Sequence, residues 1–199
     1  YTRGGLDGNT SAGKLDLFLI KYNSSGVKQW TQQLGTSAHD YGQGVTIDSS
    51  GNVYVVGRTE GSLDGNTSAG DADLFVVKYN SSGVKQWTQQ LGTSIRDSGE
   101  GITSDSSGNV YVTGFTSGGL DGNSTAGGID LFVVKYNSSG TKQWTRQLGT
   151  TSSDSGNGIT SDSSDNVYVT GYTTGSLDRA NTGNYDLIVV KYNSSGVKQ

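Results

Sequence analysis

Three copies of one acidic, amide-rich segment hold the residues whose types and spacing could bind a metal ion. Each copy reads Asp-Gly-Asn, continues with Ser and Thr in either order, and has a further Asp at position 10. Carboxylate and amide oxygens at alternating loop positions are the ligands that Ca²⁺ prefers, so the segment predicts a calcium loop. The candidate ligands are Asp7, Asn9 and Asp16, then Asp64, Asn66 and Asp73, then Asp121, Asn123 and Asp130.

An Asx-turn explains the same residues without a metal, because Asp and Asn side chains bond nearby backbone groups in turns. The segment lacks the Gly at position 6 and the Glu at position 12 of an EF-hand loop. A fourth copy, Asp178-Arg179-Ala180-Asn181, has lost the Asn at position 3 and one residue of length. Both interpretations stay open, and Ca²⁺ is the one cofactor that the sequence suggests.

Three tryptophans, Trp30, Trp87 and Trp144, offer a second kind of chemistry, the stacking of sugar rings. They are 57 residues apart, and each has a Leu four residues later in an alternating segment. Side chains an even number of residues apart lie on one face of a strand, so each Trp shares a face with its Leu. The pattern favours packing between repeats, with glycan binding as the alternative.

Two further sets of aspartates recur in every unit. Asp40, Asp97 and Asp154 precede Gly-x-Gly, and Asp48, Asp105 and Asp162 open an Asp-Ser-Ser segment. A ring of such carboxylates could bind a cation or a sugar. Identical placement in every repeat favours acceptance of backbone N–H bonds in turns, which each repeat needs in the same way.

Catalytic motifs are not found in the chain. His39 is the one histidine, there is no cysteine, and no phosphate-binding Gly-rich motif precedes a helical pattern. Active sites break symmetry, whereas the carboxylates here recur in each unit. We therefore predict that the protein is not an enzyme.

The 57-residue repeat must position all of these side chains. One unit, from Val84 to Tyr136, contains four short segments of strand type, at residues 85–91, 101–105, 110–114 and 131–136. They are alternating, or rich in β-branched and aromatic residues. Tight hairpins are expected at residues 105–109 and 137–140, with Gly in the left-handed conformation, and a long loop at residues 117–129. No segment has a 3.6-residue apolar period, so essentially no helix is expected.

Four antiparallel strands per unit, repeated along the chain, predict the blades of a β-propeller. A β-solenoid is the rival, but its parallel coils are less compatible with tight hairpins. The sequence D-S-S-G-N-V-Y-V-T-G, which follows G-x-G-I-T-S and precedes V-K-Y-N-S-S-G, resembles the seven-bladed β-propeller repeat (SBBP) family and, distantly, NHL-type blades. The resemblance implies that G-x-G-I-T-S-D is the innermost strand and K-Q-W-T-x-Q-L-G the outermost.

The tryptophans divide the chain into a partial unit, residues 1–29, and three units, residues 30–86, 87–143 and 144–199. We expect one all-β tandem-repeat arc of about 3.5 units and about thirteen strands. Closed propellers have roughly four to eight blades, so the ring is expected to be incomplete. Open blade edges invite self-association, and the arc is expected to belong to a longer array or assembly.

Composition narrows the class of function. The net charge is −4, and the repeated lysines are balanced by aspartates, which argues against a nucleic-acid partner. No apolar run reaches the length of a membrane helix. With 32 Gly, 31% hydrophobic residues and no Cys, the chain suggests a bacterial extracellular or cell-surface scaffold, adhesion module or self-assembling subunit. A glycan-binding propeller, with or without the assistance of calcium, is the alternative.

Overall fold

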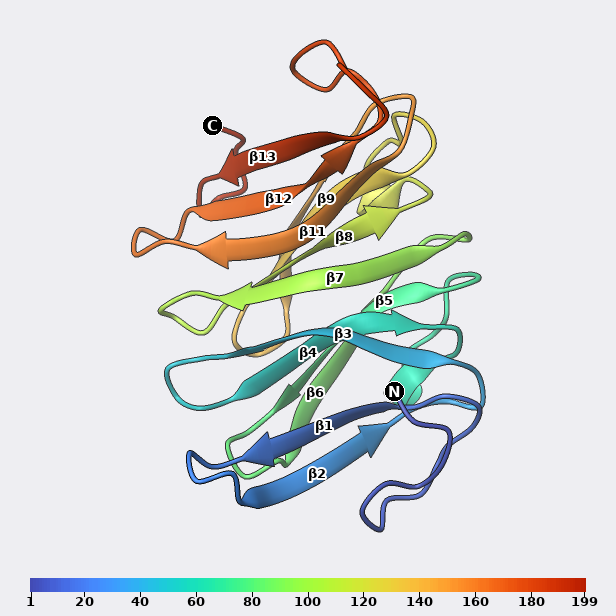
Figure 1. Cartoon of the computed structure of the whole chain (residues 1–199), viewed down its shortest axis with the longest axis vertical. Coiled ribbons are helices and arrows are strands. Elements are labelled where there is room, and N and C mark those ends of the chain that lie inside the picture. Colours follow the sequence, from blue (N-terminus) through green and yellow to red (C-terminus); the bar gives the residue numbers. More distant parts are fainter.

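The structure, a computed structural model, describes all residues from 1 to 199. Thirteen strands form four antiparallel sheets that stack side by side in an open arc (Figure 1). Two sheets are complete blades of four strands, and no ring closes, as the sequence predicted. The strands are β1 (Leu17–Tyr22) and β2 (Lys28–Leu34) in the first sheet; β3 (Asp40–Ile47), β4 (Val53–Thr59), β5 (Asp73–Tyr79) and β6 (Lys85–Leu91) in the second; β7 (Asp97–Ser104), β8 (Val110–Thr116), β9 (Asp130–Tyr136) and β10 (Lys142–Leu148) in the third; and β11 (Asp154–Ser161), β12 (Val167–Thr173) and β13 (Asp186–Tyr192) in the fourth.

Tight turns join the first two and the last two strands of each complete sheet, and a long loop joins the middle pair, as expected. Gly108 and Gly140 adopt φ values of 74° and 84° in the two hairpins of the third sheet. Asp165 replaces this glycine in the last sheet and takes φ 59°. Only glycine enters this left-handed region without steric cost, and Asp tolerates it better than most residues. The turn sequence therefore sets the strand order.

The innermost strand β7 contacts the innermost strands of both neighbouring sheets, β3 and β11, along the centre of the arc (Figure 1). Glycines allow this approach: a Cβ atom on Gly44 would lie 3.1 Å from the carbonyl oxygen of Glu100. A Cβ atom on Gly101 would lie 3.2 Å from the carbonyl oxygen of Asn157. The Trp-containing strands β2, β6 and β10 are outermost in their sheets, which confirms the predicted order within a blade.

The hydrophobic core lies between the sheets rather than inside any one of them. Alternate residues of β5 point to opposite neighbours: Val76 packs with Val112 and Phe132 of the third sheet. Val77, one residue on, packs with Leu17 of the first sheet. Each fully buried aliphatic side chain contributes roughly 1.5–3 kcal/mol to the stability of the fold. A blade is therefore stable only where a neighbouring sheet covers it.

Three details differ from the sequence expectation. The inner strand of the third sheet begins at Asp97 rather than Gly101, because a β-bulge between Gly99 and Gly101 breaks the alternation and hides the strand in the sequence. Two single 3₁₀ turns, η1 (Leu63–Gly65) and η2 (Leu120–Gly122), are the only helical segments. Neither turn has the length or apolarity to span a membrane.

The third detail concerns the boundaries of the blades. The complete sheets span residues 40–91 and 97–148, whereas division at the tryptophans places the boundaries at 30, 87 and 144. A unit that starts at Trp30 therefore begins with the outer strand of the preceding sheet. The period of a repeat is visible in sequence, but hydrogen bonding between strands decides where a blade begins.

Candidate functional site

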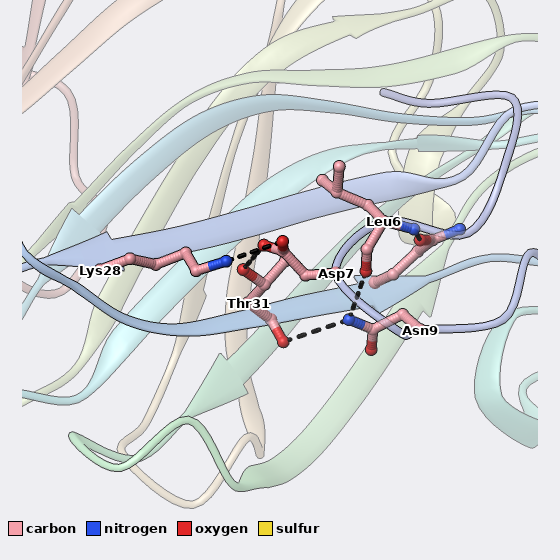
Figure 2. A network of polar contacts seen from close by, with 6 residues as sticks. Leu6, Asp7, Asn9, Lys28 and Thr31 are labelled. Carbon is pink, nitrogen blue, oxygen red and sulfur yellow. Dashed lines mark hydrogen bonds and ion pairs between the residues drawn. The ribbon is translucent and has the colours of Figure 1, made fainter.

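The first predicted calcium segment is a loop tied to the outermost strand of its sheet (Figure 2). The Asp7 carboxylate forms an ion pair with the Lys28 ammonium at 2.7 Å and accepts a hydrogen bond from the Thr31 hydroxyl at 2.5 Å. The hydrogen bond from Lys28 has the largest influence and lowers the pKa of Asp7, and the bond from Thr31 lowers it further. The Asn9 amide donates to the carbonyl oxygens of Leu6 at 2.8 Å and Thr31 at 3.4 Å.

The other two segments repeat this geometry. Asp64 pairs with Lys85, and Asp121 pairs with Lys142. The Asn66 amide donates to the Leu63 carbonyl oxygen at 2.9 Å, as Asn9 does to Leu6. The Asn therefore forms the predicted turn contact with its own loop, whereas the first Asp binds a lysine of the outer strand.

The last aspartate of each segment opens a buried strand. Asp73 is fully buried at the start of β5. Its Oδ2 accepts hydrogen bonds from the Ala69 N–H at 2.8 Å and the Gln90 side-chain amide at 2.7 Å. Asp16 and Asp130 are also fully buried and bind Gln33 and Gln147 at the same distance of 2.7 Å.

The structure therefore gives the three candidate ligands of each segment separate partners: a lysine, a loop carbonyl and a half-buried glutamine. No three acidic or histidine side chains gather into a group that could hold a metal ion. A Ca²⁺ ion bound to Asp64 would compete with the Lys85 ammonium. These contacts fasten the outermost strand to the loop, and calcium binding stays a prediction of the sequence.

The tryptophans lie at the junctions between sheets. The Trp87 ring centroid is 5.9 Å from that of Tyr54 and 6.4 Å from that of Tyr136 in the next sheet. Its Nε1–H donates to the Ser138 carbonyl oxygen at 3.3 Å. A Cβ atom on Gly140 would lie 2.8 Å from the indole, so this glycine covers part of the ring. Trp30 and Trp144 make equivalent contacts with Gly83 and Gly196.

The aspartates before Gly-x-Gly accept hydrogen bonds in turns, as predicted. Asp97 is fully buried, and its Oδ2 accepts bonds from the Thr93 N–H at 2.6 Å and the Thr93 hydroxyl at 2.9 Å. Its Oδ1 accepts a bond from the Thr116 hydroxyl. Burial is the largest influence and raises the pKa of Asp97, with a smaller contribution from the Asp73 carboxylate.

The aspartates that open the Asp-Ser-Ser hairpins also act in turns. Asp48 accepts bonds from the Ser50 and Asn52 N–H groups, both at 2.9 Å, and from the Tyr54 hydroxyl at 2.9 Å. Burial opposes ionisation, but hydrogen bonds, the strongest from the Asn52 side chain, lower the pKa of Asp48 overall. Desolvation and the Asp48 carboxylate raise the pKa of Tyr54 well above its ordinary value.

Sequence reasoning missed the glutamines Gln33, Gln90 and Gln147. The Gln90 amide accepts a bond from the Leu63 N–H at 2.9 Å and donates to the Gly61 carbonyl oxygen at 3.0 Å, in addition to its bond with Asp73. One side chain thus joins the outer strand, the loop and the buried aspartate. The second Gln of K-Q-W-T-x-Q, present in each copy, was the available signal.

A groove of about 650 Å³ lies beside β13, which has no strand on its outer edge. Its lining includes Asp186, Leu187 and Val189, and the side chains of Leu187 and Val189 are 78% and 67% exposed. The equivalent residues of the third sheet, Leu131 and Val133, are fully buried. The groove was not predicted, because its depth depends on which neighbours a strand has.

Comparison with known proteins gives a family match. The model of the SBBP β-propeller repeat matches residues 29–64, 86–121 and 143–178, which together exceed half of the chain. The Regulatory protein FlaEY of Caulobacter vibrioides is 28% identical over 165 residues, covering 75% of this chain and 17% of its own length. The Uncharacterized WD repeat-containing protein L264 of Acanthamoeba polyphaga mimivirus is 28% identical over 182 residues, covering 72% of this chain and 13% of its own.

The chain thus spans less than a fifth of the length of these two relatives. Among solved structures, a protein of unknown function from Bacteroides caccae aligns with a TM-score of 0.37 and 12% identity. The alignment covers 89% of this chain and 73% of that protein.

Proposed function

The chain belongs to the SBBP family of β-propeller repeats, and on this basis we propose that it is a non-enzymatic scaffold that associates with further blades of its own kind. One observation carries the proposal. Within the arc, Val133 of β9 and Ile159 of β11 lie in one apolar cluster between neighbouring sheets. Their repeat equivalents are Val189, on the last sheet, and Val45, on β3 beside the two-stranded first sheet, and they are 67% and 60% exposed.

The two ends of the arc therefore leave opposite halves of a junction exposed, and the interior of the arc contains this junction twice. Contact between unlike faces of two copies is heterologous, and such contacts build rings where the rotation closes and filaments where it does not. We propose a ring of seven blades, the number that the family resemblance implies, as the closed form.

The proposed location is extracellular or at a bacterial cell surface, as a structural or adhesive module. This part of the proposal rests on composition: abundant Gly, Ser, Thr and Asn, few charges and no cysteine.

A glycan-binding propeller, assisted by calcium, is the second candidate. The half-buried, regularly spaced Trp30, Trp87 and Trp144 support it. Glycines cover part of each indole, and a sugar would have to stack on what is left. We therefore rank glycan binding below assembly, and a glycan array that binds the parent chain but not Trp87→Ala would reverse the order.

Sedimentation equilibrium over a range of protein concentrations tests the assembly proposal. We expect the mean mass to rise with concentration, and we expect Val45→Asp or Val189→Asp to return it to that of one chain. Val84→Asp is the matched control, because Val84 is 58% exposed in the hairpin between β5 and β6 and is in none of the apolar clusters between sheets. A parent chain that stays monomeric at every concentration would falsify the proposal.

A further inference from the structure

We propose that one end of the arc binds an acidic carbohydrate, whose carboxylate groups pair with Arg58 and Arg96. At this end β3 and β7 begin and β4 and β8 finish, at the right of the view (Figure 1). Neither arginine belongs to the apolar clusters between sheets, so the site is independent of the assembly proposal. It also differs from the glycan candidate above, which relies on the tryptophans of the outer strands.

Strand pairing brings the relevant side chains to this end of the two complete sheets. Tyr41 of β3 lies opposite Arg58 of β4. In the third sheet, Phe115 near the end of β8 lies opposite the beginning of β7. Arg96 immediately precedes β7 and forms a parallel bridge with Ala72, the residue before β5. This bridge places Arg96 at the border between the second and third sheets.

Each complete sheet stacks one arginine on one aromatic ring at this end. The guanidinium carbon of Arg58 is 4.2 Å from the ring centroid of Tyr41, and that of Arg96 is 5.4 Å from the ring centroid of Phe115. A guanidinium that stacks through its flat face keeps N–H groups at its edge for hydrogen bonding. Two such groups match the two oxygens of a carboxylate.

These two arginines have no ion-pair partner within the chain. Each of the four ion pairs joins a lysine to an aspartate. Arg146, by contrast, donates hydrogen bonds to the carbonyl oxygens of Gly196 and Thr145. In a chain with a net charge of −4, two guanidinium groups without a carboxylate are free to bind an anionic ligand.

The arginine–aromatic pairs are not a requirement of the repeat. The residues one period from Arg58 and from Arg96 include Phe115 and His39, neither of which is an arginine. In the second sheet the aromatic ring of the pair is on the inner strand, whereas in the third sheet it is on the next strand. Lysines that bind hairpin carbonyls recur in three sheets. Pairs that arise at non-equivalent positions therefore point to a ligand rather than to the folding of a blade.

The other polar groups at this end select the type of anion. Glu60, Asp71 and Glu100 lie near the same strand ends, and none forms an ion pair. Their charges would repel a densely charged polyphosphate more strongly than a sugar acid with one carboxylate per ring. The hydroxyl groups of Ser117 and Ser153, beside the ends of β8 and β11, can bond sugar hydroxyls. An acidic oligosaccharide is therefore the ligand that fits best.

Isothermal titration calorimetry of the parent chain with tetragalacturonate tests the site directly. We expect saturable binding that weakens as salt is added, because the charges involved are accessible to solvent. The methyl-esterified tetramer has the same rings without the charges and should bind at least about tenfold more weakly. Absence of saturation at millimolar tetragalacturonate, or equal binding of the ester, would overturn the site.

Arginine variants locate the binding. Arg58→Gln and Arg96→Gln should each weaken tetragalacturonate binding about tenfold, because each removes a charge-assisted contact. Arg179→Gln is the matched control, because Arg179 is an exposed arginine in the loop before β13. All variants are first checked for an unchanged β-sheet spectrum. Equal weakening by the control would show that binding follows net charge alone and would contradict the site.

Tyr41 is a positioning residue, because its ring holds the Arg58 guanidinium. Tyr41→Leu should weaken tetragalacturonate binding about threefold, whereas Tyr41→Phe keeps the ring and should bind like the parent chain. Glu60→Gln should strengthen binding about twofold by removing a like charge from the ligand's surroundings. Equal binding by the Leu and Phe variants would contradict the stacked geometry, and weaker binding by Glu60→Gln would contradict an anionic ligand.

Discussion

The third and fourth sheets share almost the same sequence but differ in how completely they are covered. In the third sheet, β10 closes the outer edge and the fourth sheet covers one face, and Leu131 and Val133 are fully buried. In the fourth sheet, the equivalent Leu187 and Val189 are 78% and 67% exposed. Equivalent strands of nearly identical sequence are thus buried in the core or exposed at the surface, depending on which strands and sheets lie beside them.

The polar groups show the same contrast. In the third sheet the Thr116 hydroxyl donates to Oδ1 of Asp97. In the fourth sheet the Thr173 hydroxyl donates to the Gly175 carbonyl oxygen, and the buried Oδ1 of Asp154 has no hydrogen-bond partner. Orphaned buried oxygens carry a desolvation cost, and Oδ1 of Asp154 bears a cost that the equivalent oxygen of Asp97 does not.

Truncation of one leucine gives the largest expected difference between the two sheets. Leu131→Ala should lower the free energy of unfolding by about 2–5 kcal/mol, because it leaves a cavity in a packed junction. Leu187→Ala, the matched change on an exposed strand, should cost less than about 0.5 kcal/mol. Urea denaturation measures both. Similar costs would show that the fourth sheet is covered in solution.

Removal of the missed glutamine should have the next largest effect. Gln147→Ala deletes three hydrogen bonds, including one to the fully buried Asp130, and should cost about 2–3 kcal/mol. Gln143→Ala is the control, because this exposed side chain donates only to the Thr141 carbonyl oxygen. Thermal unfolding compares the two variants. Equal stability would contradict the role of Gln147 in fastening the outermost strand to the loop.

The pKa values of the two classes of turn aspartate should be shifted in opposite directions. Burial raises the pKa of Asp97, so its contribution to stability is present below the unfolded pKa and is lost as pH rises through the folded pKa. Hydrogen bonds, the largest from Asn166, lower the pKa of Asp162, so its contribution is lost as pH falls through the folded pKa. Carboxyl ¹³C NMR should therefore place the pKa of Asp97 above the ordinary aspartate value of 3.8 and the pKa of Asp162 below it. The reverse order would refute both assignments.

Removal of the lysine that pairs with the first aspartate of a segment should have the smallest effect on stability. Lys142→Ala breaks a partly exposed ion pair with Asp121 and should cost about 0.5 kcal/mol, whereas Lys198→Ala, with Asp178 70% exposed, should cost almost nothing. Because Lys85 holds Asp64, millimolar Ca²⁺ should leave the Tm of the parent chain nearly unchanged. A clear rise in Tm that Asp64→Ala removes would establish the calcium loop instead.

Local signals were sufficient for most of the blade. The Gly of each hairpin, the alternation in K-Q-W-T-x-Q-L and the long loop at residues 117–129 placed the strands to within a few residues. The start of β7 at Asp97 was missed because a bulge interrupts its period. The partners of Asp64 and Asp73 were also missed, since Lys85 and Gln90 lie 21 and 17 residues further along the chain.

The amino-acid sequence by itself determined that this protein is a repeat of four-stranded blades and which turns join the strands, whereas the order of the strands from inside to outside came from its resemblance to the SBBP family. Those properties depend on backbone preferences within a few residues and on a period of 57 residues. Tertiary structure alone decided which copy of each residue is buried, what the aspartates bind, and where a groove opens beside β13. Burial and hydrogen bonding depend on which strands meet, and nearly identical repeats with unequal neighbours cannot reveal that in sequence.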